Sequence, residues 1–166
     1  MKTNKPLTKE KAFERLAGLC ARSEQCEVDA NKKLISWGIN ATDRREIIQQ
    51  LIDQRYIDDT RYARSFALDK ARFSYWGPAK IRIELLKKKI KSKLIKEALE
   101  NVDPSIWREG LWHTVRNKAK NYNLVGEEAI DNSMKLYRYL ISRGFPGSAS
   151  SKAVNYMKKI QEGNEE

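Results

Sequence analysis

The chain has 166 residues, which is room for one ordinary domain or a short array of small units. It is basic, with 33 Lys and Arg against 22 Asp and Glu, and its two cysteines are too few for a disulfide scaffold. No run approaches the roughly 18 apolar residues of a membrane span, and the N-terminus has no apolar signal-peptide core. We therefore expect a soluble, cytoplasmic protein without membrane association, in which Cys20 and Cys26 are reduced thiols rather than a disulfide.

The first part of the chain predicts three helices. The first is expected over residues 8–22, and the second after Ser23 as N-cap, stopping at Gly38. The third is expected to start near Thr42 or Asp43, where an Asp-x-x-Glu pattern has the spacing of a capping box. Helical spacing turns one set of side chains of the first helix inward: Phe13, Leu16, Ala17 and Cys20.

The middle of the chain has the clearest helix boundaries. Asp58 and Asp59 sit where short carboxylates can accept the unpaired amides of a first helical turn. That helix is expected to end at Gly77, Pro78 suits the first position of the next helix, and a third helix follows Ser92. The expected apolar sides comprise Tyr62, Ala63, Phe66, Ala67 and Phe73, then Ile81, Leu85 and Leu86, then Leu94, Ile95, Ala98, Leu99 and Val102.

The last part opens on Asp103 and Pro104, a capping aspartate followed by proline at the first helical position. Two further helices are expected, at roughly 127–143 and about 149–161, and we expect the tail at 163–166 to fray. The apolar positions are Ile106, Trp107, Leu111 and Val115 on the first helix, and Ile130, Met134, Tyr137, Leu140 and Ile141 on the second.

An internal repeat unites these helices. The six-residue segments that begin at Leu34, Leu85 and Leu140 align without gaps, and the positions 8, 9 and 12 residues beyond each segment are all apolar. No alternating strand pattern occurs. The sequence therefore predicts an all-α fold of nine helices in three tandem three-helix repeats (residues 1–57, 58–102 and 103–166). Each repeat is too small to be strongly stable alone, so neighbours must share apolar surface in an elongated, gently curved array.

A search for catalytic chemistry finds little. His113 is the single histidine and has no obvious serine or cysteine partner, so we interpret it as structural or as surface. Asp58 and Asp59 are also residue types that ligate cations or do acid–base work, but helix capping explains both. The sequence contains neither a GxxxxGK(S/T) phosphate-binding loop nor a GxGxxG turn. We expect no enzyme activity, no cofactor and no metal.

Binding chemistry is better supported, because residues 58–102 hold 12 basic and 6 acidic side chains and so over half of the net charge of +11. This indicates a polyanionic partner or an acidic protein groove, and the alternative is a solvated helical surface. The candidate binding residues are Arg61, Arg64, Arg72, Tyr75, Trp76, Lys80, Arg82, Lys87, Lys88, Lys89, Lys91 and Lys93. For Tyr75 and Trp76, packing and contact are equally open. A second basic set extends this face or is ordinary surface: Arg138, Arg143, Lys152, Lys158 and Lys159.

A motif of fixed spacings runs through the same region: Tyr56, Asp58, Arg61, Tyr62 and Ala63, then Gly77, Lys80, Ile81, Glu84 and Leu85. It resembles the central motif of the RecX family, bacterial regulators that bind and restrain the RecA recombinase. The resemblance covers about residues 8–160 and implies three helical repeats. Lys89 stands where the family usually has glycine, and lysine carries a steric cost in a left-handed turn that glycine avoids.

The resemblance implies a regulator, expected as a monomer, that lies along the RecA–DNA filament. It would meet acidic protein surface or the DNA backbone and hinder filament growth, ATP turnover and strand exchange. The alternative hypothesis is a sequence-nonspecific nucleic-acid-binding helical protein without a recombinase partner. A third, an enzyme that uses Asp58 and Asp59, is disfavoured by the capping argument.

Overall fold

The computed structural model describes residues 7–163, which contain nine α-helices and no strand. The prediction of an all-α fold is confirmed. The predicted fraying of the tail at 163–166 is not tested, because residues 164–166 lie outside the described part of the chain. The helices are α1 (Lys9–Cys20), α2 (Glu27–Ser36), α3 (Ala41–Asp53), α4 (Asp59–Phe73), α5 (Pro78–Lys87), α6 (Ser92–Glu100), α7 (Pro104–Ala119), α8 (Ala129–Ser142) and α9 (Gly147–Gln161).

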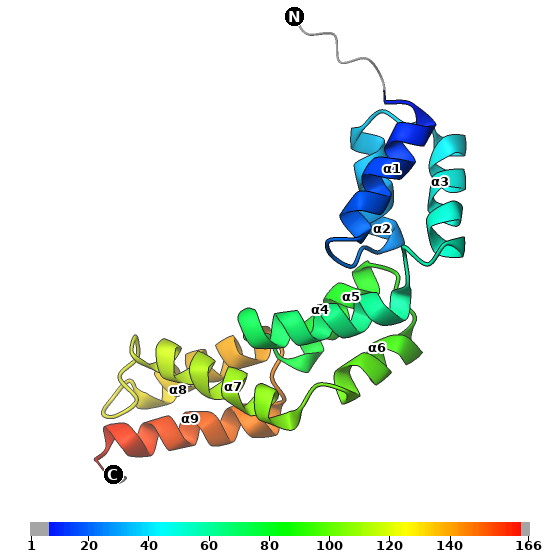
Figure 1. Ribbon diagram of the computed structural model, residues 1–166. Coiled ribbons are helices and arrows are strands. Elements are labelled where there is room, and N and C mark those ends of the chain that lie inside the picture. The colour runs from blue at the N-terminus through cyan, green and yellow to red at the C-terminus, as the bar shows by residue number, and fades with distance from the viewer. Residues whose placement is uncertain (1–6, 164–166) are drawn as a thin grey trace, which may run out of the picture.

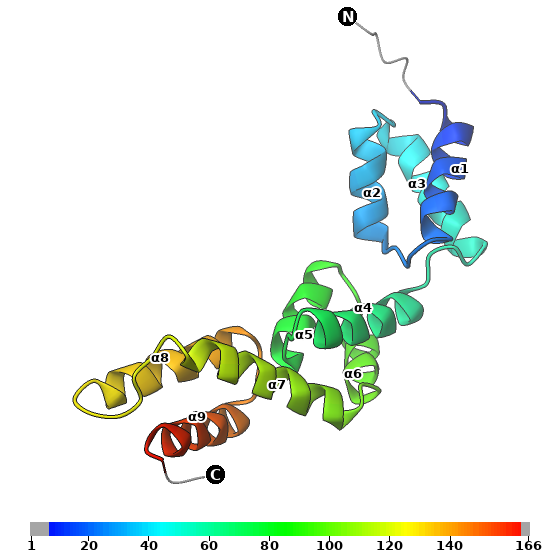
Figure 2. The same ribbon diagram turned by 60° about the vertical axis from the view of Figure 1, so that its left-hand side comes forward.

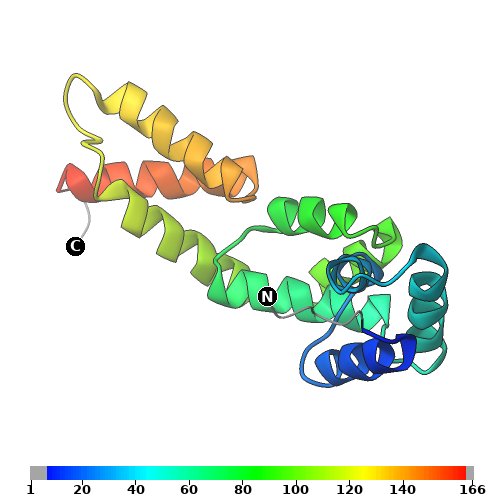
Figure 3. The ribbon, with the colours of Figure 1, turned by 90° about the horizontal axis from the view of Figure 1, so that it is seen from above.

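The helices form three consecutive three-helix units, which we call the first (α1–α3), second (α4–α6) and third (α7–α9) unit. Figures 1 and 2 show the units following one another along an arc, with the first and third at its two ends. Seen from above, the third unit extends away from the other two (Figure 3). Each unit is built around its own apolar cluster, centred on Leu34, Leu85 and Leu140 respectively. The elongated, curved array is therefore as predicted, and the exact divisions at 57/58 and 102/103 remain a proposal.

Several helix starts follow from local chemistry, as predicted. The Asp58 carboxylate accepts the amide of Arg61 at 2.9 Å and so caps α4. Asp103 caps α7 through the amide of Ser105 at 2.7 Å. Pro78 and Pro104 occupy the first positions of α5 and α7, where no amide hydrogen is needed.

Three predicted boundaries were wrong. α2 does not start after Ser23, because the chain stays extended until Cys26, which precedes the helix without a side-chain cap. α3 is capped by Asn40, whose side chain accepts the amide of Asp43 at 3.0 Å, so the expected capping box at Asp43 is not the start. α4 ends before Gly77, since Tyr75 already has a left-handed φ of 51°.

The aligned six-residue segments end three helices with one type of turn. Gly38, Lys89 and Gly144 all adopt a left-handed conformation, with φ of 77°, 61° and 93°. In each turn the next residue donates its amide to the carbonyl five positions earlier, at 3.0, 3.1 and 3.2 Å, which is the hydrogen bond of a Schellman motif. Lys89 therefore keeps the turn of the repeat although it lacks the freedom of glycine.

The buried stripe of α4 corrects one core prediction. Tyr62 is buried as expected, but Phe73 is 78% exposed. The stripe runs through Ala63, Ala67 and Ala71 at four-residue spacing, and Phe73 lies two residues further on, on the opposite side of the helix. Other large side chains of the predicted apolar sides are also exposed to water: Leu86 on α5, and Ile130, Met134 and Ile141 on α8.

The second and third units are joined backbone to backbone. The Gly77 amide donates to the Arg143 carbonyl at 2.8 Å, and the Ala79 amide donates to the Gly144 carbonyl at 3.1 Å. A Cβ placed on Gly77 would lie 2.3 Å from the Gly144 carbonyl carbon, so no side chain fits. Gly77 thus permits a close approach between units, a role different from the predicted helix stop.

Replacing Lys89 by glycine is expected to stabilise the protein. A left-handed L-residue costs about 1–2 kcal/mol, and the added chain freedom of glycine returns about 0.5–1 kcal/mol of that. Urea unfolding of Lys89→Gly should therefore give a free energy of unfolding higher by about 0.5–1 kcal/mol. The control is Lys96→Gly in the interior of α6, which should lower it by a similar amount. An equal loss in both variants would contradict the strain at Lys89.

Candidate functional site

The twelve predicted binding residues all belong to the second unit, but they differ in what holds them. α4 carries Arg61, Arg64 and Arg72, the α4–α5 connection carries Tyr75 and Trp76, and α5 carries Lys80, Arg82 and Lys87. The turn into α6 carries Lys88, Lys89 and Lys91, and Lys93 lies in the first turn of α6. Their partners divide them into cations tied to carboxylates, groups packed on aromatic rings, and cations left open to a partner.

Three of the predicted cations are tied to exposed or half-buried carboxylates. Arg61 reaches from α4 to Glu24 of the first unit, with Nε 2.9 Å from Oε1. Lys87 pairs with Glu84 one turn earlier at 2.8 Å, and Lys93 lies 4.0 Å from Glu97. Pairs of this kind contribute little stability, but their charge is already compensated.

Lys88 is part of the joint between the first and second units. Its Nζ lies 2.5 and 2.7 Å from the two carboxylate oxygens of Asp29 on α2, and the Tyr62 hydroxyl donates to the same carboxylate at 3.4 Å. Burial would raise the pKa of Asp29, but the hydrogen bond and the charge of Lys88 hold it below its usual value. Burial also raises the pKa of Tyr62, which keeps its proton for this bond. The structure therefore places Lys88 in a structural ion pair.

The two aromatic candidates pack rather than project. Trp76 is half-buried on the cluster of the second unit, and the Nζ atoms of Lys70 and Lys80 lie 5.0 and 4.5 Å from its ring centroid. Tyr75 stacks on His113 of α7, with ring centroids 3.7 Å apart. Both rings thus have structural partners, and both residues are partly exposed.

Five predicted cations remain open to a partner. They are exposed to solvent, and none has an ion pair within 4.0 Å among the residues that the structure describes: Arg64, Arg72, Arg82, Lys89 and Lys91. The three guanidinium groups can each bind a carboxylate or a phosphate with two parallel hydrogen bonds. Phe73, which follows Arg72 in the sequence, adds an exposed ring that the core prediction had placed on the apolar side.

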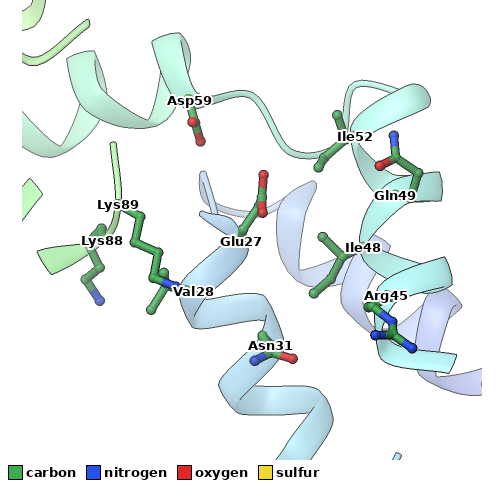
Figure 4. A pocket seen from close by; sticks show the side chains of 10 residues that line it. All are labelled: Glu27, Val28, Asn31, Arg45, Ile48, Gln49, Ile52, Asp59, Lys88 and Lys89. Atoms are coloured by element: carbon green, nitrogen blue, oxygen red, sulfur yellow. The ribbon is translucent and has the colours of Figure 1, made fainter. Parts of the chain in front are cut away.

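A groove of about 490 Å³ lies between the first and second units, and of the five open cations Lys89 lines it. α2 and α3 form one wall, and Asp59, Lys88 and Lys89 form the other (Figure 4). The lining holds acidic side chains at Glu27 and Asp59, basic ones that include Lys88 and Lys89, and apolar ones that include Ile48 and Ile52. Burial and the neighbouring Asp58 raise the pKa of Asp59, while Lys91 opposes this. A lining of both charge signs suits a protein segment better than a bare phosphate chain, which the carboxylates would repel.

The second basic set does not form one surface. Arg143 is half-buried at the junction of the second and third units, where its guanidinium donates to the Ser74 carbonyl. Lys158 lies 3.8 Å from Glu162, whereas Arg138 and Lys152 are exposed on α8 and α9. Lys159 is exposed as well. Charge alone did not distinguish Arg143, which lies inside a junction, from its exposed neighbours.

Within residues 7–163, no group of three or more His, Cys, Asp and Glu side chains is placed to hold a metal ion. The same part of the chain has no helix long and apolar enough to cross a membrane.

Comparison with known proteins agrees with the sequence resemblance. A family model described as "RecX, second three-helix domain" matches residues 58–99. Regulatory protein RecX of Clostridium beijerinckii is 32% identical over 137 residues, which cover 81% of this chain and 61% of the relative. The protein of the same name from Xanthomonas axonopodis pv. citri is 28% identical over 143 residues, which cover 86% and 85%.

Solved structures show the same fold. A crystal structure of regulatory protein RecX superimposes with a TM-score of 0.75 at 24% identity, over 89% of this chain and 71% of the other. The crystal structure of RecX from Lactobacillus salivarius gives a TM-score of 0.70 at 22% identity, over 90% and 96%. These likenesses extend well beyond the second unit and include the arrangement of the three units.

The Lys88–Asp29 pair is expected to stabilise the joint in a pH-dependent way. Because the folded pKa of Asp29 lies below its unfolded value of about 3.9, the pair stabilises the protein above that pH. Its contribution is lost as the pH falls through the folded pKa. Lys88→Met should lower the free energy of unfolding by about 1–2 kcal/mol at pH 7, since a half-buried carboxylate loses its partner. The difference from the parent protein should shrink on acidification, as urea unfolding at several pH values will show.

The matched control for this prediction is Lys87→Met, which removes a neighbouring lysine whose pair with Glu84 lies within one helix. It should change stability by no more than about 0.5 kcal/mol at any pH. Equal losses of unfolding free energy for the two variants would contradict a stabilising role of the Lys88–Asp29 pair. A loss for Lys88→Met that persists in acid would contradict it as well.

Proposed function

The chain belongs to the RecX family of regulatory proteins, and from this premise we propose that it binds the RecA recombinase on DNA and restrains it. One observation carries the proposal. The segment that matches the family model, residues 58–99, is also the segment with most of the excess positive charge and with the open cations of α4 and α5. A regulator needs a binding surface rather than a reaction centre, and this is the surface that the chain offers.

The shape of the molecule supports binding along a filament. Three units in an arc present a long surface without a long single helix (Figure 1). The backbone contact at Gly77 and Gly144 fixes the second unit to the third, and the Lys88–Asp29 pair ties the first to the second. A monomer of this form can lie in the helical groove of a filament and touch neighbouring recombinase subunits. Occupying that groove hinders filament growth, ATP turnover and strand exchange, and it places the regulator with its partner in the cytoplasm.

The charges suggest how the surface is divided. The open guanidinium groups of Arg64, Arg72 and Arg82 suit acidic side chains of a protein or the phosphates of DNA. The groove of mixed charge beside Lys89 suits a protein segment, as argued above. The protein partner therefore explains more of the surface than DNA alone.

Removing the open cations is expected to abolish regulation. A variant with Arg64, Arg72, Arg82 and Lys89 all changed to glutamine keeps polar side chains with part of the aliphatic stems but loses four charges. In a titration of recombinase ATP turnover on single-stranded DNA, the parent protein should inhibit at near-stoichiometric ratios. The variant should need at least about tenfold more protein, because each charge-assisted hydrogen bond contributes about 1.5–3 kcal/mol.

The control variant loses the same charge elsewhere, by glutamine substitution of Lys11, Arg22, Arg108 and Lys120, which are exposed and without ion pairs in the described part of the chain. It should inhibit like the parent protein. If the site variant is folded and inhibits at the same ratio as the parent protein, these four residues are not the contacts, although the proposed function still holds. If the parent protein leaves ATP turnover unchanged even in excess, the recombinase is not its target.

A second candidate function, sequence-nonspecific binding of nucleic acid without a recombinase, is favoured by the five cations that lack ion pairs. If each neutralises one phosphate of duplex DNA, the logarithm of the binding constant should fall with the logarithm of salt concentration at a slope of about −4.5. Fluorescence anisotropy at several salt concentrations measures this slope. A slope near zero would exclude this candidate, whereas the recombinase proposal depends mainly on a protein surface.

A further inference from the structure

A second pocket, on the junction between the second and third units, has a composition unlike that of the groove. Its volume is about 240 Å³, and it is lined by Tyr75, His113, Thr114, Asn117, Lys118, Tyr139 and Arg143. Two cations, an amide, a hydroxyl and three aromatic rings meet there, and no carboxylate is among them. Pockets in which a few polar groups converge on aromatic walls are typical of ligand sites.

The two cations of the pocket are held without neutralisation. Lys118 Nζ lies 4.7 Å from the ring centroid of Tyr139 and 5.8 Å from that of Tyr122, so aromatic faces rather than an acid position it. Arg143 donates to the Ser74 carbonyl, and its buried Nε has no hydrogen-bond partner in the described part of the chain. A buried donor without a partner is uncommon in folded proteins and calls for an explanation. Both side chains favour an anion.

The aromatic wall is set up at a conformational cost. Tyr75 has a left-handed φ of 51°, which is unfavourable for a bulky side chain, and its ring stacks on His113 at an interplanar angle of 22°. The Asn117 side-chain nitrogen lies 3.1 Å from Nε2 of the same histidine. Strained residues that hold a ring in place concentrate at binding sites, where the ring can stack a planar group.

The size of the pocket restricts the ligand. At about 240 Å³ it is smaller than the range of roughly 300–1,000 Å³ that encloses whole cofactors and drug-sized molecules. It has space for one phosphate and part of one base. Cationic grooves combined with stacking rings are how proteins hold single-stranded nucleic acid.

We propose that this junction pocket binds one nucleotide of single-stranded DNA, with its phosphate on Lys118 and Arg143 and its base against the rings of Tyr75, His113 and Tyr139. The biological role of this pocket rests on the proposed function, because the recombinase filament forms on single-stranded DNA. The pocket would add a contact with that DNA to the contacts with the recombinase. None of the open cations of α4 and α5 lines this pocket, although Arg72 lines a neighbouring pocket together with Tyr75. DNA and protein contacts are thereby assigned to different parts of the arc.

The single histidine of the chain makes the pocket directly observable. The ring signals of His113 in NMR spectra should shift when a short oligothymidylate is added, because a base or phosphate enters beside the ring. Thymidine monophosphate at equal nucleotide concentration should shift them less, since it lacks the neighbouring phosphates that the strand provides. If thymidine monophosphate shifts the signals equally, the ligand is a free nucleotide and the proposed binding of a DNA strand is wrong. If inorganic phosphate shifts them equally, the proposed contact with the base is wrong.

A carboxylate placed in the pocket tests the phosphate contact. Asn117→Asp should weaken binding of the labelled oligothymidylate at low salt by about tenfold, the equivalent of one charge-assisted hydrogen bond. Asn155→Asp, exposed on α9 and outside the pocket, makes the same change in net charge and should stay within about twofold. Lys118→Gln should reproduce the loss without adding an acid.

No recombinase is present in these binding measurements, so the pocket and the proposed function can fail separately. Unmoved His113 signals at saturating oligothymidylate would overturn the pocket. Equal affinities of Asn117→Asp and Asn155→Asp would overturn it as well. Neither result would change the ATP-turnover test of filament binding.

Discussion

The form of this protein depends on the contact between the backbones of Gly77 and Gly144. Two inter-unit hydrogen bonds, at 2.8 and 3.1 Å, are possible only because neither residue has a Cβ in the space between the chains. This contact sets the angle between the second and third units, and it also builds the junction pocket, since Tyr75 and Arg143 flank it. The joint to the first unit is different in kind, because it combines ion pairs of Lys88 with Asp29 and Arg61 with Glu24 with the packing of Cys26 and Val28 on the apolar cluster of the second unit. One joint is made by backbone hydrogen bonds between closely approaching chains, and the other by side-chain ion pairs together with apolar packing.

This difference gives the distribution of charge a physical meaning. Positive charge in the second unit serves two purposes: part of it ties the units together, and part remains unpaired on α4, α5 and the following turn. Lys88 and Lys89 are neighbours in the sequence but belong to different groups, since one is held by Asp29 and the other is exposed. The proposed binding to an extended filament needs both a fixed shape and free charges, and the same short segment contributes to each.

Local chemistry made much of the fold predictable from the sequence. Asp58, Pro78 and the Asp103–Pro104 pair fix helix starts through neighbouring amides, and the repeated six-residue segments predicted three similar turns. Long-range geometry was not predictable. Nothing near Lys88 in the sequence indicates Asp29, 59 residues away, and the exposure of Phe73 depends on where the stripe of α4 meets its neighbours. The junction pocket was missed because its residues come from three separate segments: Tyr75 was a candidate binding residue, Arg143 belonged to the second basic set, and His113 was interpreted as structural or as surface.

The most direct test of filament binding is an electron cryomicroscopy reconstruction of the recombinase on single-stranded DNA in the presence of this protein. Density for a three-unit arc should lie in the helical groove and span neighbouring subunits, with the exposed sides of α4 and α5 facing recombinase. The third unit, with the junction pocket, should lie on the side nearer the DNA. Undecorated filaments at saturating protein, or an arc bound with the second unit turned to solvent, would contradict the proposed mode of binding.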